Sequence, residues 1–90
     1  MDETTIKTII DSCLTSTLTS GEAVVARSTD NKDLYWNYLI LNSDFGAVGS
    51  IDFVPSTRIF RINTYGSTLS ISDSYKQGLG KKLSAAINSQ

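Results

Sequence analysis

The strongest strand signal in the chain is the segment Leu34-Tyr35-Trp36-Asn37-Tyr38-Leu39-Ile40-Leu41-Asn42. Aromatic and β-branched residues favour strands, and turn-forming residues flank this segment on both sides. Side chains along a strand point alternately to opposite faces of a sheet. One face would therefore carry Leu34 to Ile40 in steps of two, and the other Tyr35 to Leu41, with Asn37 among them. The segment predicts a strand with apolar side chains on both faces.

Other runs with a period of two surround this strand, at residues 22–28, 47–54, 57–64 and 68–72. Short links rich in turn-forming residues separate the runs, at 29–33, 43–46, 55–56 and 65–67. Links this short join antiparallel neighbours, because parallel strands need a long crossover. The strands are therefore expected to form a meander.

The two ends of the chain have helical periodicity instead. Residues 4–18 place apolar side chains on one stripe, and residues 73–88 repeat that spacing from Tyr75 to Ile87. The sequence therefore predicts a single α+β domain over residues 1–90. It has an N-terminal helix, an antiparallel meander of four or five strands and a C-terminal helix, with both helices on one face of the sheet.

The composition excludes most catalytic chemistry. The chain has no histidine and a single cysteine, Cys13. Histidine is the usual general base at neutral pH and the commonest metal ligand, so Ser-His and Cys-His nucleophile pairs are absent. Cys13 falls on the apolar stripe of the first helix, where it is read as a small core residue. The acidic pair Asp30 and Asp33 lacks the length of a calcium-binding loop. We therefore expect no enzyme activity, no metal and no cofactor.

Charge and hydropathy bear on location. No segment approaches the about 18 apolar residues of a membrane span. The start, Met1-Asp2-Glu3, lacks the basic and apolar regions of a signal peptide. A cytoplasmic protein without membrane contact is therefore expected. The net charge of −1 is unevenly spread: eight acidic and three basic residues precede Pro55, and one acidic and five basic residues follow it. This asymmetry indicates either a basic binding face or attraction between the two halves.

One face of the predicted sheet indicates an interaction surface. If Phe53, Phe60 and Ile62, with Leu69 and Ile71, face the helices, the open face carries Tyr35, Leu39, Leu41, Val48, Val54 and Ile59. The open face of a half-covered sheet is normally polar, so an apolar one suggests a protein partner. The chain is therefore interpreted as an accessory or regulatory interaction module. Its partner is either a second copy, giving a homodimer, or a different protein. Trp, Tyr and Arg are the usual anchors, and the expected interface residues are Tyr35, Trp36, Tyr38, Leu39, Phe45 and Arg61.

Nucleic acid is not the expected partner of this sheet. Arginines beside aromatic residues do stack single-stranded nucleic acid in several small folds. Such proteins normally carry a strong basic patch, however, and the pI of this chain is about 5.1.

The segment Tyr75-Lys76-Gln77-Gly78-Leu79-Gly80-Lys81-Lys82-Leu83 carries a second hypothesis. After the strand-like run at 68–72, it resembles the acetyl-CoA signature of the GNAT family of N-acetyltransferases, where a strand leads through a glycine-rich turn into a helix. The resemblance implies a truncated acetyltransferase-like fold whose amides around Gln77, Gly78 and Gly80, beside Lys81, hold the pyrophosphate of an acyl-CoA or another phosphate ligand. The alternatives are a helix that starts near Gly80, and a helix whose glycines allow close packing. A small-molecule ligand is the secondary hypothesis.

Overall fold

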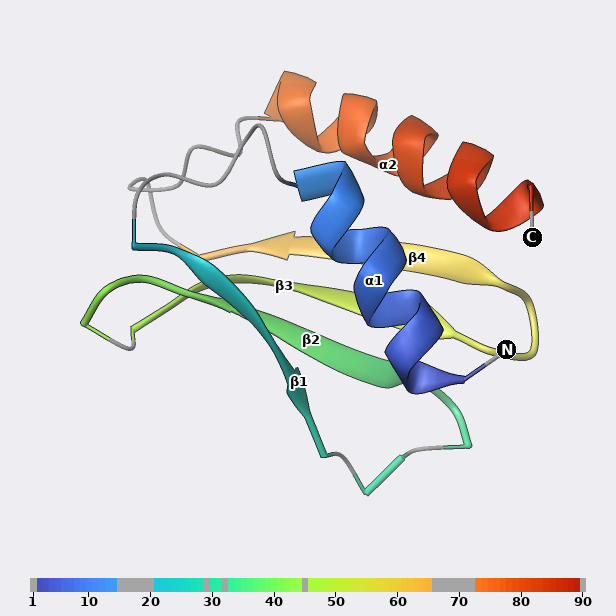
Figure 1. Cartoon of the computed structure of the whole chain (residues 1–90), viewed down its shortest axis with the longest axis horizontal. Coiled ribbons are helices and arrows are strands. Elements are labelled where there is room, and N and C mark those ends of the chain that lie inside the picture. Colours follow the sequence, from blue (N-terminus) through green and yellow to red (C-terminus); the bar gives the residue numbers. More distant parts are fainter. Residues whose placement is uncertain are drawn as a thin grey trace.

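Figure 1 shows the computed structural model, which describes residues 2–14, 21–28, 30–31, 33–44, 46–65 and 73–89, with the backbone alone at 64 and 73–77. The elements are α1 (Glu3–Leu14), β1 (Ala23–Arg27), β2 (Trp36–Leu41), β3 (Ala47–Val54), β4 (Ile59–Thr64) and α2 (Asp73–Asn88). The strands form one antiparallel sheet in the order β1-β2-β3-β4. Both helices lie on the same face of this sheet (Figure 1).

The predicted architecture is confirmed: an N-terminal helix, an antiparallel meander and a C-terminal helix make an α+β fold. The range predicted for the last helix, 73–88, agrees with α2, and 47–54 agrees with β3. The first helix was predicted to reach residue 18, and residues 15–18 lie outside the described part. The predicted fifth strand at 68–72 also lies outside it.

The start of α1 is fixed by Asp2, which acts as its N-cap. The backbone N–H and the hydroxyl of Thr5 both donate to Asp2 Oδ1, each at 2.8 Å. These two hydrogen bonds favour the charged carboxylate and lower the pKa of Asp2. One turn later, Lys7 Nζ lies 2.8 Å from Asp11 Oδ2 across one turn of the helix. The helix therefore begins where sequence chemistry satisfies its free amides.

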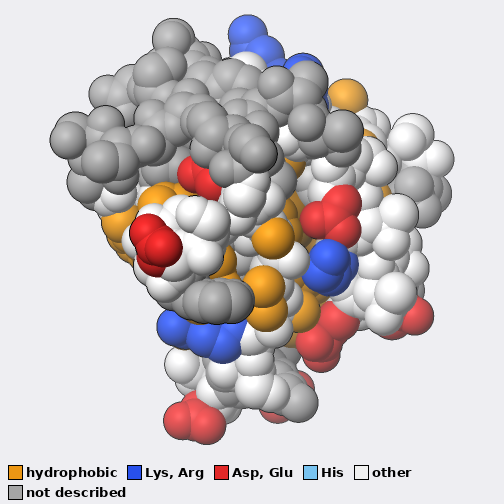
Figure 2. Space-filling view, turned by 60° about the vertical axis from the view of Figure 1, so that its left-hand side comes forward, with side chains coloured by type: hydrophobic (Ala, Val, Ile, Leu, Met, Phe, Trp, Pro, Cys, Tyr) orange, Lys and Arg blue, Asp and Glu red, His pale blue; other side chains and the backbone are white. Residues whose placement is uncertain are grey.

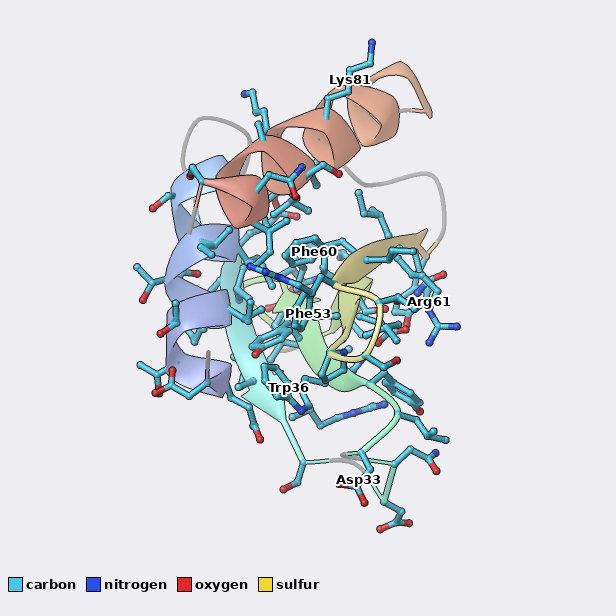
Figure 3. The ribbon with its side chains drawn as sticks, turned by 90° about the vertical axis from the view of Figure 1, so that its right-hand side faces the viewer. Asp33, Trp36, Phe53, Phe60, Arg61 and Lys81 are labelled. Atoms are coloured by element: carbon cyan, nitrogen blue, oxygen red, sulfur yellow. The ribbon has the colours of Figure 1, made fainter. Side chains whose placement is uncertain are left out.

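A single hydrophobic core lies between the sheet and the two helices. It combines the apolar stripes of α1 and α2 with the side chains on one face of the strands. Three aromatic side chains from neighbouring strands line its lower part, with ring centroids 5.4 Å apart for Trp36 and Phe53 and 4.9 Å apart for Phe53 and Phe60. Figure 3 shows this row between the sheet and the helices. The fully buried core side chains include Ile6, Ile10, Leu14, Ile40, Ile51, Leu79 and Leu83.

An irregularity near the β2–β3 hairpin changes one predicted orientation. The pairing shifts from Ile40–Gly49 to Leu41–Ala47, which leaves Val48 as an extra residue in β3. Val48 was predicted to point outward. The prediction is wrong, because Val48 is only 6% exposed and belongs to the hydrophobic core.

Tyr38 joins the first turn of α1 to the middle of the sheet. Its side chain is 1% exposed, and its hydroxyl donates a hydrogen bond of 2.9 Å to the backbone carbonyl of Glu3. Burial, followed by the nearby negative charges of Glu3 and Asp2, raises the pKa of the Tyr38 phenol. The folded protein therefore keeps this proton at a pH where the unfolded chain has already lost it.

Replacing Tyr38 with Phe tests this contact. The substitution removes one hydrogen bond and is expected to lower the free energy of unfolding by about 1 kcal/mol at neutral pH. Because the phenol pKa is raised on folding, wild-type stability should fall as the pH rises above the ordinary tyrosine value of 10.0. Tyr38→Phe should lack that part of the alkaline loss. Urea unfolding at a series of pH values measures both effects. Tyr65→Phe is the control, and an equal alkaline loss in Tyr38→Phe and wild type would contradict the assignment.

Candidate functional site

The face of the sheet opposite the helices carries a row of polar side chains. Directly paired residues of neighbouring strands share a face, and the register places Arg27, Asn37, Asp52 and Arg61 side by side across all four strands. We call this set the polar row and its side of the sheet the open face. Among the described residues, no helix or strand lies over this face, and Figure 3 shows Arg61 pointing away from both helices.

At the centre of the polar row, Asn37 is buried although no element covers it. Its side-chain Nδ2 donates to Asp52 Oδ1 at 2.6 Å, and the residue is only 6% exposed. Within the described part of the chain, Asn37 Oδ1 is buried and has no hydrogen-bond partner. A buried acceptor without a partner costs about 1–3 kcal/mol. This polar centre therefore lowers the stability of the isolated fold.

Arg61 stacks on an aromatic ring at one end of this arrangement. Its guanidinium carbon lies 5.5 Å from the centre of the Tyr35 ring, although the strand register pairs Arg61 with Asp52. A cation over an aromatic face is attracted by the ring quadrupole, which contributes about 0.5–1 kcal/mol at an exposed site. The stacking holds Tyr35 against the sheet, so that its ring forms part of the open face.

Apolar side chains fill the rows beside the polar row. Leu39 pairs with Val25 on one side and with Ser50 on the other, and Leu41 follows in the next row. Leu39 and Leu41 are half-buried, whereas Val25 is 43% exposed. Further along, Ile59 is 56% exposed. Half of the open face is thus apolar surface in contact with solvent.

A second polar cluster links β3 to the residue after β4. The hydroxyls of Ser50 and Tyr65 lie 3.0 Å apart, and Asn63 Nδ2 donates to Ser50 Oγ at 3.3 Å. Ser50 is only 1% exposed. The sequence reasoning missed these residues together with Asp52. The signal that could have found them is the alternation of polar residues at 50 and 52 with the apolar residues at 51 and 53.

The structure brings together three of the six residues predicted for the interface. Tyr35, Leu39 and Arg61 all lie on the open face. The predictions for Trp36 and Tyr38 are wrong, because both side chains point to the helices. Tyr38 is buried there, and Trp36 packs on Phe53 in the core. Adjacent residues of a strand cannot share one face, so the predicted set was inconsistent. The last predicted residue, Phe45, lies outside the described part.

The apolar surface continues around the side of the molecule. Figure 2 shows hydrophobic side chains at the surface in the middle of this view, with acidic side chains around them. The described residues that expose large apolar groups are Val25, Leu34, Ile59 and Tyr65. Neither the helices nor the loops that the structure describes seal these groups from water.

The glycines of α2 do not form the turn that the acetyltransferase resemblance implies. The helix begins at Asp73, so Gly78 and Gly80 lie inside it and their amides can bond to carbonyls one turn earlier. The alternative of a helix starting near Gly80 is wrong for the same reason. Close packing is wrong as well, because a Cβ at either position would meet no atom within 4 Å. The side chain of Gln77 lies outside the described part.

One open pocket adjoins these glycines on the helix side of the molecule. It has a volume of about 630 Å³ and is lined by Arg58, Ile59, Phe60, Gly80, Lys81 and Ser84. Arg58 lies in the turn before β4 with a positive φ of 57°, and its guanidinium donates to the carbonyl of Ile87 at 3.1 Å. We call this space the β4–α2 pocket. It includes Gly80 and Lys81 from the predicted ligand residues, and Gly78 is not among its lining residues.

The reactive groups of the described chain are poorly arranged for catalysis. Burial raises the pKa of the Cys13 thiol, with a smaller opposing effect of Lys82, so the nucleophilic thiolate is disfavoured at neutral pH. Across the described ranges, no three Cys, Asp or Glu side chains group closely enough to hold a metal ion. Neither described helix has the length and apolar character needed to cross a membrane.

Comparison of the chain with protein-family models, with curated proteins and with solved structures finds no match. The functional argument therefore depends on the open face and on the β4–α2 pocket.

Asn37→Asp tests the polar row. The substitution would bring two carboxylates together where Asn37 Nδ2 now donates to Asp52 at 2.6 Å. At neutral pH we expect a loss of about 1–3 kcal/mol in the free energy of unfolding, because like charges would meet in a poorly solvated place. In acid, one protonated carboxyl can donate to the other, so most of the loss should disappear. Urea unfolding at about pH 7 and about pH 4 measures this difference. Asn63→Asp is the control, and equal losses in the two variants would contradict the account.

Gly78→Ala tests whether the α2 glycines serve the fold. A Cβ at this position meets open space, and Ala is favoured over Gly in a helix interior by about 1 kcal/mol. The variant is therefore expected to be more stable by about that amount in thermal or urea unfolding. Ala85→Gly, at an exposed position of the same helix, should lose a similar amount. A destabilised Gly78→Ala would show that the glycine serves a packing role.

Proposed function

We propose that the protein is a non-enzymatic interaction module that associates with a second copy of itself through the open face. The observation that carries this proposal is the placement of both helices on one side of the sheet, which leaves apolar side chains uncovered on the other side. Such a module would act as an accessory or regulatory protein. An intracellular location belongs to the same proposal, since the single thiol of Cys13 suits a reducing compartment.

The composition of the open face supports a partner rather than solvent. An exposed face of an antiparallel sheet normally alternates to polar residues. Here Leu39 and Leu41 occupy the central strand, and Tyr35 is held flat by Arg61. Covering these groups would remove apolar area from water, which contributes about 25 cal/mol per Å². The buried Asn37 limits the number of ways in which a partner can pack, because its neighbourhood tolerates polar groups better than apolar ones.

The charges of the polar row favour one arrangement of two copies. A two-fold axis along β2, lying between two stacked sheets, places β1 of one copy over β3 of the other. Arg27 then faces Asp52 of the second copy, and the symmetry repeats this contact on the other side. Other placements are less favourable. An axis between β2 and β3 opposes Arg27 and Arg61, and an axis across the strands opposes each charge with its own copy.

The same arrangement joins the apolar side chains of β2. Residues that lie on the axis meet their own copies, so Leu39 would contact Leu39 and Leu41 would contact Leu41 of the second copy. Val25 would lie over Ser50, and Ala23 over Ala47. An apolar seam flanked by two Arg–Asp contacts results. Sheets stack about 10 Å apart, a distance that facing arginine and aspartate side chains can bridge.

The size of this surface indicates a weak association. Three overlapping strands about 4.8 Å apart and about six residues long cover roughly 15 by 20 Å. Stable complexes bury about 800 Å² on each partner. Self-association is therefore expected to be reversible and to depend on protein concentration.

Leu39→Lys tests the proposed surface. The substitution places a charge on the axis while leaving the core on the other face unchanged, and it should weaken self-association at least about tenfold. Sedimentation velocity between about 10 μM and about 1 mM measures the monomer–dimer equilibrium. Ser12→Lys, on the exposed side of α1, is the matched control and should behave like wild type. A wild-type protein that stays monomeric over this range would refute self-association.

Two arginines of the polar row provide the test of the register. Arg27→Glu would oppose Asp52 of the second copy and should weaken the dimer. Arg61→Glu changes the same residue type in the same row, but β4 lies outside the overlap, so its effect should be small. The reverse order of effects would contradict an axis along β2 even if the protein dimerises.

A further inference from the structure

We propose that the β4–α2 pocket binds a small amphiphilic anion, with a carboxylate or phosphate group at the rim and an apolar body on the floor. The pocket lies on the helix side of the molecule and is independent of the open face. Its volume of about 630 Å³ is within the range of small-molecule sites, which is about 300–1,000 Å³.

The floor and the rim of the pocket differ in chemistry. Ile59 and the half-buried Phe60 supply apolar surface from β4. Lys81 and Ser84 come from α2, and Arg58 comes from the turn before β4. Figure 3 shows Lys81 extending into solvent from α2, with Phe60 on the sheet below it. A ligand would therefore place its charge near the cations at the outside and its apolar part against Ile59 and Phe60.

Gly80 is the observation that separates this pocket from an accidental hollow. Glycine in a helix interior is less favourable than alanine by about 1 kcal/mol, so its presence calls for a reason. Neither a helix end nor close packing supplies one, because Gly80 lies well inside α2 and a Cβ there would meet no atom within 4 Å. What the missing side chain does provide is space in the wall of the pocket.

Arg58 occupies an unusual backbone conformation at the edge of the same pocket. Its φ of 57° lies in the left-handed region, which bulky residues adopt at a cost of about 1 kcal/mol or more. The guanidinium bonds to the carbonyl of Ile87 in the last turn of α2, where a cation also complements the helix dipole. This contact holds one positive charge in place before any ligand arrives. Arg58 therefore has a structural role, and the test of binding uses Lys81 and Gly80.

The binding experiment uses sodium octanoate, octyl phosphate and neutral octanol as probes, each titrated into the full chain and followed by NMR shifts of the α2 and β4 amides. At least one of the two anions should bind, and octanol should bind at least about fivefold more weakly. Octanoate and octyl phosphate distinguish a carboxylate ligand from a phosphate ligand. Binding of neither anion, or equal binding of octanol, would overturn the proposal.

Two pairs of variants locate the site. Lys81→Glu should weaken binding of the anion at least about fivefold, whereas Lys82→Glu, one residue further along the same helix and outside the lining, should change it less than about twofold. Gly80→Leu should fill the pocket and abolish binding, whereas Gly78→Leu should not. Both leucines improve helix propensity, so lost binding cannot be ascribed to unfolding. Equal effects within either pair would overturn the assignment of the pocket.

Discussion

The structure depends on the fact that two helices compete for one face of a four-stranded sheet. Both helices have a single apolar stripe, and both stripes are satisfied by the same layer of strand side chains. The hydrogen bond from Tyr38 to the Glu3 carbonyl ties α1 to β2, and the bond from Arg58 to the Ile87 carbonyl ties α2 to the turn before β4. With both helices fixed in this way, the other face of the sheet has no cover of its own within the described chain.

The sequence was sufficient to predict the elements, because each is marked by a local period. The stripe from Ile6 to Leu14 and the run from Ala47 to Val54 led to helix and strand directly. The face of each residue was harder to predict. Trp36 and Tyr38 were chosen as anchors for their residue type, although their even positions place them with Ile40 in the core. The extra residue Val48 turned inward because a bulge, which no local pattern announced, changed the register.

The polar row and the pocket were beyond prediction for a different reason. Arg27, Asn37, Asp52 and Arg61 are far apart in the sequence, and only the register of three strand pairs brings them into line. The glycines of α2 did attract attention as a helix anomaly. Their environment could not be inferred, however, because it depends on how far α2 stands from β4. In both cases the missing information concerns distances between elements that are themselves correctly predicted.

The central claim is that the uncovered face of the sheet meets a second copy along β2. A sample in which half of the molecules carry carbon-13 and half are unlabelled allows only contacts between copies to be selected in a filtered NOE experiment. The account predicts contacts between the methyl groups of Leu39 and Leu41 and those of the second copy, at a concentration where dimers form. Intermolecular contacts confined to the outer surfaces of α1 or α2, with none from β2, would contradict it.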